Sequence, residues 1–240
     1  MNILLFTERD LIDATRLRVA DQRLAHLLDV HGARPGDTVR VGRVNGACGT
    51  GTITSIDDTH ADLELALDKA PPDKLPLTLV LALPRPKMLR RILRTVGECG
   101  IRELHLINSY KVEKSFWQSP LLAPATLEDY LLAGLEQASD TMVPTCSLHH
   151  RFKPFVEDVL PALCDRADAV VAHPGDHPIL AAASGADMVM VIGPEGGFTD
   201  YEVRKCRESG CRPVSLGPRV LRVETAVAAA LGVQLAGAGG

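Results

Sequence analysis

Two short loops near the C-terminal end combine glycines with charged side chains. The first is Gly193-Pro194-Glu195-Gly196-Gly197, and the second is Leu216-Gly217-Pro218-Arg219. Glycine lets a ligand approach the backbone closely, and the start of a following helix offers free N–H groups. The alternative is a plain tight turn, although three glycines in five residues exceed what one turn needs. We therefore treat both loops as candidate parts of a ligand site.

The residues of the first loop restrict its ligand. They match neither GxGxxG nor GxxxxGK[ST], and they lack the lysine of a P-loop. Glu195 also places a carboxylate among the amides that a phosphate would need, and it would repel a polyphosphate. A ligand without phosphate, in particular one with a positive group such as a sulfonium, fits this loop better.

Charged side chains also follow the second loop. Arg219, Arg222 and Glu224 come just before an alanine-rich segment, 226–231. Such a segment is typical of a helix that packs closely against a neighbour, and close packing does not explain the charges. These side chains are therefore candidates for chemistry at the mouth of the site.

Both loops follow apolar runs that predict buried strands, at 188–192 and 214–216. Further strands are predicted at 77–83, 104–107 and 169–172, with helices at 89–96 and 127–138 and a capping box at 199–202. Apolar strands that alternate with helices indicate a parallel sheet covered on both faces. We therefore expect an α/β domain over 74–240, with both loops at the same edge of the sheet.

The first seventy residues have a different pattern. Short strands such as 38–41, an alternation at Leu63, Leu65 and Leu67, and several glycine turns predict a small β-barrel over 1–70. Pro71-Pro72 then interrupts any strand and marks the linker between the two domains.

A basic stripe follows the first strand of the second domain. Five of the ten residues 85–94 are basic and none is acidic, in a chain whose net charge is −4. Such a local excess favours contact with an RNA backbone, whereas the alternative is an ordinary solvated helix face.

Other residue types exclude several functions. The six cysteines form no CxxC pair, and we expect His26, His31, His149 and His150 to hold no metal. A single tryptophan argues against an extended aromatic platform for single strands. No nucleophile elbow supports a hydrolase. No apolar run approaches the length of about 20 residues that a membrane span needs, so we expect a cytoplasmic protein without a membrane partner.

The two loops with their flanks, 193–198 and 216–226, closely resemble the signature of the RsmE-type 16S ribosomal RNA uridine N3-methyltransferases of the SPOUT superfamily. The likeness extends to Arg23-x-x-His26, Gly36-Asp37, Glu136-Gln137 and Pro144, and so covers nearly the whole chain. This resemblance implies an N-terminal PUA-like β-barrel, a trefoil-knotted C-terminal SPOUT domain and a homodimer. It also implies S-adenosyl-L-methionine as cofactor and 16S rRNA, or the small ribosomal subunit, as partner.

The resemblance assigns candidate residues to each role. The expected cofactor-binding residues are Leu83, Ile192, Gly193, Glu195, Gly196, Leu216, Gly217, Leu221 and Thr225. The expected RNA-binding residues are Arg23, His26, Arg85, Lys87, Arg90, Arg91, Arg94 and Lys111. Uracil N3 must lose a proton before it accepts a methyl group, so we expect Arg222 to stabilise the developing charge. Glu224, or less favourably Glu195, would accept the proton or orient Arg222.

Three positions depart from the family pattern: Gly32, Thr95 and Asp140 stand where many members carry basic residues. The departures concern RNA contact more than the cofactor site, and Arg90, Arg91, Arg94 or Lys111 could replace the missing cations. Two other functions remain open, namely methylation of a different RNA position and a non-catalytic factor that binds ribosomal RNA during assembly.

Overall fold

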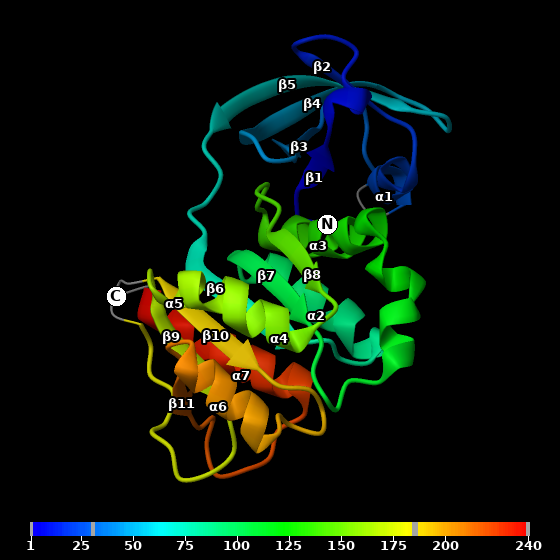
Figure 1. Ribbon diagram of the computed structural model, residues 1–240. Coiled ribbons are helices and arrows are strands. Elements are labelled where there is room, and N and C mark those ends of the chain that lie inside the picture. Colours follow the sequence, from blue (N-terminus) through cyan, green and yellow to red (C-terminus); the bar gives the residue numbers. More distant parts are fainter. Residues whose placement is uncertain (1, 30–31, 184–186, 239–240) are drawn as a thin grey trace. The chain divides into compact units, whose positions relative to one another are not determined.

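The computed structural model describes residues 2–29, 32–183 and 187–238. The chain forms two compact units (Figure 1). The first comprises Met1–Asp73 together with Leu132–Val143, and the second comprises Lys74–Leu131 and Pro144–Gly240. The sequence did not predict that 132–143 groups with the first unit, and the domain division at residues 70–74 remains a prediction.

The first unit contains a five-stranded sheet in the order β1-β3-β4-β5-β2. Its elements are β1 (Leu4–Phe6), β2 (Arg16–Val19), α1 (Gln22–Asp29), β3 (Thr38–Arg43), β4 (Cys48–Ile56) and β5 (Ala61–Lys69). β1 pairs in parallel with β3, and the other pairs are antiparallel. The expected alternation in β5 is present at its start, where Leu63 is fully buried while Leu65 and Leu67 are partly buried against the same core. This part of the chain is β-rich, as predicted.

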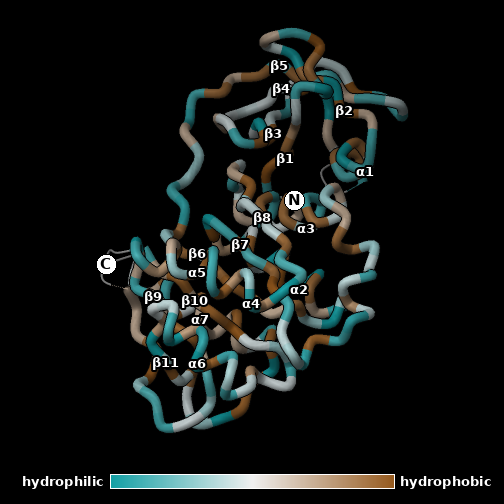
Figure 2. Tube along the Cα trace, in the orientation of Figure 1, coloured by the Kyte–Doolittle hydropathy of each residue, from teal (hydrophilic) through white to brown (hydrophobic). Residues whose placement is uncertain are grey.

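The second unit contains a six-stranded, wholly parallel sheet in the order β11-β9-β10-β6-β7-β8. Its strands are β6 (Leu75–Ala82), β7 (Ile101–Ile107), β8 (Thr145–His149), β9 (Asp168–Ala172), β10 (Met188–Ile192) and β11 (Arg212–Val214). Every residue of β10 is buried, as an apolar strand in the middle of such a sheet requires (Figure 2). The predicted α/β class is confirmed.

Helices cover both faces of this sheet (Figure 1). They are α2 (Pro86–Glu98), α4 (Phe152–Pro154), α5 (Leu160–Cys164), α6 (Asp200–Glu208) and α7 (Val223–Ala238). A further helix, α3 (Pro124–Ala138), begins in this unit and ends in the first. α2 and α7 pack against each other, and α7 also contacts β6 and β10, whereas α5 and α6 contact β9. No helix in the described part of the chain is long and apolar enough to cross a membrane.

Most predicted elements of this unit are confirmed, and their buried faces agree. In α2 the stripe of Leu89, Ile92, Leu93 and Val96 is buried, and Gly100 follows the helix with a positive φ of 64°. The predicted strand at 214–216 is misplaced, because β11 ends at Val214 and residue 215 makes only a single bridge. The connection between β7 and α3 contains two short 3-10 helices, Lys114–Gln118 and Pro120–Leu122.

Candidate active site

A pocket lies at the carboxyl edge of the parallel sheet, where β9, β10 and β11 end. β9 pairs with β10 on one side and with β11 on the other, so the loops that follow all three strands meet there. The pocket has a volume of about 210 Å³. Its lining residues come from 172–174, 192–198, 215–217, 219–221, 223 and 226. Parallel α/β sheets commonly bind ligands at this edge.

Most of the predicted cofactor residues line this pocket. They are Ile192, Gly193, Glu195, Gly196, Leu216, Gly217 and Leu221. Leu83 and Thr225 are described residues that do not line it. Leu83 is fully buried and donates its N–H to the carbonyl of Ile107, while Thr225 is exposed on α7. Cofactor binding by these two residues therefore remains a prediction.

Two glycines show why these loops differ from ordinary turns. Gly197 and Gly217 have φ values of 69° and 111°, a region that side chains disfavour. A Cβ atom on either residue would meet no atom within 4 Å, so neither glycine is needed for packing inside the protein. Both backbones instead border the open volume of the pocket. This arrangement suits a ligand that approaches the main chain closely.

The first glycine loop is held by two predicted RNA-binding residues. The backbone N–H of Arg85 donates to the exposed Glu195 carboxylate at 3.2 Å, and Lys111 Nζ donates to the Gly196 carbonyl at 2.7 Å. The side chains of Arg85 and Lys111 are exposed. Cationic groups therefore lie beside the pocket, close to its carboxylate.

The proposed catalytic pair lies where the second loop enters α7. Arg222 is exposed, and no ion pair to it occurs within the described residues. Glu224 is partly buried, and its Oε1 lies 3.7 Å from Arg91 Nη1. The neighbours Leu221 and Val223 line the pocket, whereas Arg222 and Glu224 themselves are not among its lining residues. The structure thus places Arg91 beside Glu224, a contact that the sequence did not predict.

The sequence analysis missed His173, which lines the pocket at the end of β9. Its N–H donates to the Val214 carbonyl at 3.0 Å, which fixes the backbone between the two loops. Burial lowers the pKa of His173, and the nearby His177 lowers it further. The signal was present, since His173 directly follows the strand predicted at 169–172. Phe198 and Ser215 also line the pocket without having been predicted.

The capping box predicted at residues 199–202 is confirmed. Glu202 N donates to Thr199 Oγ1 at 3.3 Å, while the Glu202 carboxylate accepts from Thr199 N at 2.8 Å. Glu202 is 2% exposed, and its other oxygen accepts the N–H of Tyr110 at 2.7 Å. One buried carboxylate therefore joins the start of α6 to the loop after β7.

The basic stripe of α2 is exposed along its whole length. Arg85, Lys87, Arg90, Arg91 and Arg94 all lie in contact with solvent. The Arg94 guanidinium lies 5.3 Å from the centre of the Tyr130 ring, a cation–π geometry. The stripe is free to meet a polyanion, although exposure alone also fits a solvated helix face.

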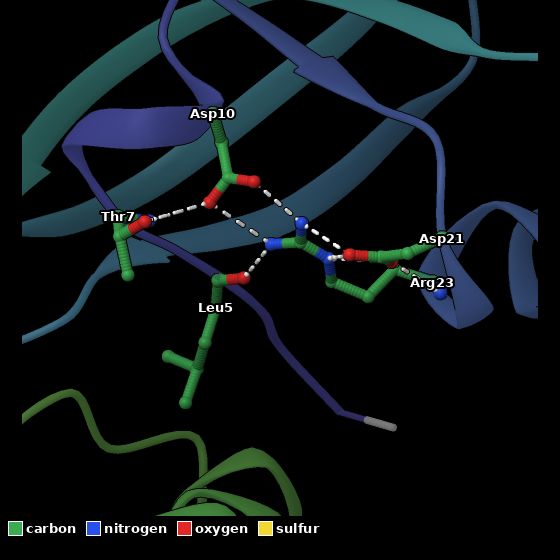
Figure 3. Close-up of polar contacts among 5 residues, drawn as sticks. All are labelled: Leu5, Thr7, Asp10, Asp21 and Arg23. Carbon is green, nitrogen blue, oxygen red and sulfur yellow. Dashed lines mark hydrogen bonds and ion pairs between the residues drawn. The ribbon is translucent and has the colours of Figure 1, made fainter. Parts of the chain in front are cut away.

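Arg23 belongs to the first unit, and its guanidinium is hydrogen-bonded to other residues of that unit (Figure 3). Its Nε donates to Asp21, its Nη1 to the Leu5 carbonyl and Asp10, and its Nη2 to Asp10 and Asp21, at 2.6–3.2 Å. A guanidinium has five N–H groups, so these contacts use them all. Burial raises the pKa of Asp10, but the hydrogen bonds from Arg23 and Thr7 lower it more, and the net pKa is lowered.

His26 lines a polar groove of about 300 Å³ in the same unit, together with Gln22, Arg23, Ala133, Glu136 and Gln137. The groove therefore brings together the Arg23-x-x-His26 and Glu136-Gln137 pairs that carry part of the family resemblance. Burial raises the pKa of Glu136. RNA binding by Arg23 and His26 remains a prediction, and the structure gives Arg23 a structural role in addition.

The three departures from the family pattern each have a local structural role. Gly32 has φ 55° and donates its N–H to the Leu28 carbonyl just after α1. Thr95 Oγ1 bonds the Arg91 carbonyl within α2. Asp140 is buried and accepts the N–H groups of residues 141 and 142. None of the three presents a cation.

No group of three or more His, Cys, Asp or Glu side chains suited to a metal occurs in residues 2–29, 32–183 and 187–238. His149 instead pairs with His105, with Nε2 and Nδ1 3.0 Å apart, and the His150 ring lies 4.3 Å from that of Trp117. His31 lies outside the described residues.

A pocket at the carboxyl edge of a parallel sheet, with exposed basic residues beside it, fits a protein of the RNA-methyltransferase class. A family model described as "RNA methyltransferase domain" matches residues 71–234. The ribosomal RNA small subunit methyltransferase E of Treponema pallidum is 31% identical over 99% of this chain and 92% of that relative. A protein of the same name from Synechocystis is 28% identical, over 95% of this chain and 75% of that relative. The chain belongs to this methyltransferase E family.

Solved structures share the fold at lower identity. A ribosomal RNA small subunit methyltransferase E from Neisseria gonorrhoeae, bound to S-adenosyl methionine, is similar with a TM-score of 0.74 and 20% identity, over 96% of this chain and 95% of that chain. A methyltransferase from Legionella pneumophila with the same cofactor gives a TM-score of 0.76 at 20% identity, over 99% and 97%. These likenesses extend over both units of the chain.

Proposed function

We propose that this protein uses S-adenosyl-L-methionine to methylate N3 of a uridine in the 16S rRNA of the small ribosomal subunit. The observation that carries this proposal is the pocket formed by the two glycine loops, in a chain that belongs to the methyltransferase E family. The relatives' names and the cofactor bound in the Neisseria structure support the class of reaction and the cofactor.

The residues of the pocket fit this cofactor. Open space beside Gly197 and Gly217 admits a ligand against the main chain, and Ile192, Leu221 and Val223 supply apolar walls. The exposed Glu195 carboxylate suits a positive sulfonium and opposes a polyphosphate. When bound, the cofactor would supply the methyl group.

The chain's own groups would manage charge and protons at the acceptor base. Arg222 has an exposed guanidinium and would stabilise the negative charge that spreads over the uracil carbonyl oxygens once N3 is deprotonated. Glu224, or less favourably Glu195, would accept the N3 proton. Arginine itself cannot be the base, because its pKa stays above about 12. Arg91, 3.7 Å from Glu224, would help to orient that carboxylate.

The RNA would bind along the exposed basic stripe of α2 and Lys111, with help from the first unit acting as a PUA-like module. A trefoil knot in the second unit and a homodimer with active sites at its interface complete the proposal. Sedimentation of the purified protein tests the dimer, and a monomer at all concentrations would contradict it.

Two measurements test the function. Calorimetry should detect S-adenosyl-L-methionine binding, and absence of binding would favour a non-catalytic assembly factor. Mass mapping of small-subunit rRNA from a deletion strain should show the loss of one methyl group from a uridine base. Loss from a ribose 2′-hydroxyl or a guanine would instead indicate a different RNA position.

The catalytic assignment has its own test. Arg222→Ala should bind the cofactor with unchanged affinity but lose about 100-fold or more in kcat, since it removes a charge used in the transition state. Arg222→Lys should recover part of this loss, because it restores the charge without the fork geometry. Full methylation by Arg222→Ala would refute the role of Arg222.

A further inference from the structure

The loop that follows β7 presents an aromatic ring to solvent beside the pocket. Tyr110 is 84% exposed, although it lies at the carboxyl edge of a well-packed parallel sheet. An exposed tyrosine by itself means little, since much of any protein surface is apolar. What distinguishes Tyr110 is that its backbone is fixed to the elements that form the pocket.

The first attachment runs through Glu202. This buried carboxylate accepts the Tyr110 N–H at 2.7 Å with one oxygen, and with the other it accepts the Thr199 N–H and hydroxyl at 2.8 and 2.9 Å. Thr199 directly follows Phe198, a lining residue of the pocket. Burying a carboxylate is costly unless it is well hydrogen-bonded, so three such bonds make this link rigid.

The second attachment is made by the next residue. Lys111 Nζ donates to the Gly196 carbonyl at 2.7 Å, and Gly196 lines the pocket. A Cβ atom on Gly196 would lie 2.8 Å from Lys111 Cδ, so the lysine stem packs directly on the glycine loop. Tyr110 is therefore held between two contacts that both lead to the first glycine loop, while its ring remains free.

An exposed aromatic ring on a fixed backbone, next in sequence to a cation, is suited to an unpaired nucleobase. Proteins recognise single-stranded RNA by stacking bases on aromatic side chains, and nearby cations attract the phosphates. A ring on a fixed backbone also loses little entropy when it binds. Lys111 and Arg85, both exposed, supply the cations at the same edge of the pocket.

We propose that Tyr110 stacks on an unpaired base of the RNA substrate at the mouth of the pocket, and so positions the target nucleotide there. This inference rests on the proposed function, because it assumes that the pocket holds the methyl donor. It adds a residue that the basic stripe and the family signature do not include. A single stacking ring agrees with the low aromatic content of the chain, which argues against an extended stacking platform.

Steady-state kinetics with matched variants test this role. Tyr110→Ala should raise KM for a small-subunit rRNA fragment about tenfold or more, the range expected when one base–aromatic stack is lost. Tyr110→Phe should stay near the wild type, because it keeps the ring. Tyr201→Ala is the matched control, since Tyr201 is 44% exposed on α6 and its ring is covered by Arg204 at 5.5 Å. The cofactor Kd should be the same in all four proteins.

A direct measurement does not depend on turnover. Irradiation of the wild type with a 5-iodouridine-substituted fragment of the same RNA should cross-link the peptide that contains Tyr110, and Tyr110→Ala should lose that product. The stacking role alone would be overturned by an unchanged KM in Tyr110→Ala. It would also be overturned if the RNA cross-linked only to peptides that do not contain Tyr110. A Tyr110→Ala protein with an altered sedimentation coefficient would also overturn it, by placing the ring in a contact between two copies of the chain. Failure of the wild type to bind the cofactor would instead overturn the proposed function.

Discussion

Arginine residues illustrate how differently one side-chain type is used in this protein. All five N–H groups of Arg23 are bonded inside the first unit, to two carboxylates and one carbonyl. Arg222 is exposed beside the pocket, without an ion pair in the described part of the chain. The sequence predicts a functional role for both, because a guanidinium can bind phosphate or carboxylate equally well. Only the surrounding hydrogen bonds distinguish a structural arginine from one available to a ligand.

A stability measurement distinguishes the two roles of Arg23. Arg23→Ala should lower the free energy of unfolding by about 2–3 kcal/mol, because it leaves the partly buried Asp10 carboxylate without its partner. Arg23→Lys should recover little of this loss, since lysine cannot bond Asp10, Asp21 and the Leu5 carbonyl at once. Chemical denaturation monitored by circular dichroism provides the measurement.

The matched control is Arg16→Ala, because Arg16 makes only an exposed pair with Asp13. Such an exposed pair contributes little to the free energy of unfolding. Arg23→Ala with wild-type stability but weakened RNA binding would contradict the structural role and support the prediction from the sequence.

At the scale of elements, neighbouring strands bring together residues that are distant in sequence. β7 and β8 pair in parallel, and they place His105 and His149 side by side, with rings 5.2 Å apart. One ring must donate and the other accept in their 3.0 Å hydrogen bond, so the pair requires at least one neutral histidine. Burial lowers the pKa of His105, although Glu103 partly offsets the effect. Burial, and then the charge of His105, lower the pKa of His149.

This pair predicts a loss of stability in mild acid. The unfolded chain takes up protons at these histidines near pH 6.5, whereas the folded chain resists them until a lower pH. The free energy of unfolding should therefore fall as the pH drops from about 7.5 toward 5.5. His149→Gln should show a shallower fall than the wild type in urea titrations.

The control for this prediction is His150→Gln, since His150 packs against Trp117 and lies outside the pair. His173, whose pKa is also lowered, is unchanged in both variants, so its effect cancels in the comparison. Equal slopes in His149→Gln and His150→Gln would show that the pair does not cause the pH dependence.

At the scale of the whole molecule, charge is distributed unevenly in a chain that is acidic overall. The net charge is −4, yet the α2 stripe and Lys111 are exposed, and Lys111 and the start of the stripe at Arg85 contact the first glycine loop at the carboxyl edge of the parallel sheet. At the amino edge Arg102 pairs with Asp187 at 2.8 Å and Arg212 pairs with Asp168 at 2.7 Å. A polyanion should therefore be attracted to the edge that carries the pocket.

The salt dependence of RNA binding tests this asymmetry. If Arg90 contacts a phosphate, Arg90→Ala should reduce the slope of log K against log salt by about 0.7–0.9. Arg102→Ala is the control at the amino edge and should leave the slope unchanged. The measurement is filter binding of a small-subunit rRNA fragment at salt concentrations from about 50 to about 300 mM. Equal slopes for the wild type and Arg90→Ala would indicate that the stripe is an ordinary solvated helix face.

Much of the second unit could be predicted because its strands are fully buried and its α2 helix is amphipathic. β10 agrees residue for residue with the apolar run at 188–192. β1 and β8 were not predicted, because β1 is only three residues long and the residues of β8 are mostly half-buried, so neither has a strong pattern. The grouping of 132–143 with the first unit was also missed, since α3 continues from one unit into the other without a break in its sequence pattern.

The sequence by itself determined the local features: the two glycine loops, the carboxylate in the first loop, the basic stripe, the capping box and the family. Each depends on residues that lie close together in the chain, so spacing alone reveals it. Only the tertiary structure decided that β9 lies between β10 and β11, which brings His173 to the pocket. It also decided that Arg23 is fully hydrogen-bonded and that Tyr110 is fixed to Glu202 across 92 residues. Such contacts arise from strand order and packing, which no short sequence pattern encodes.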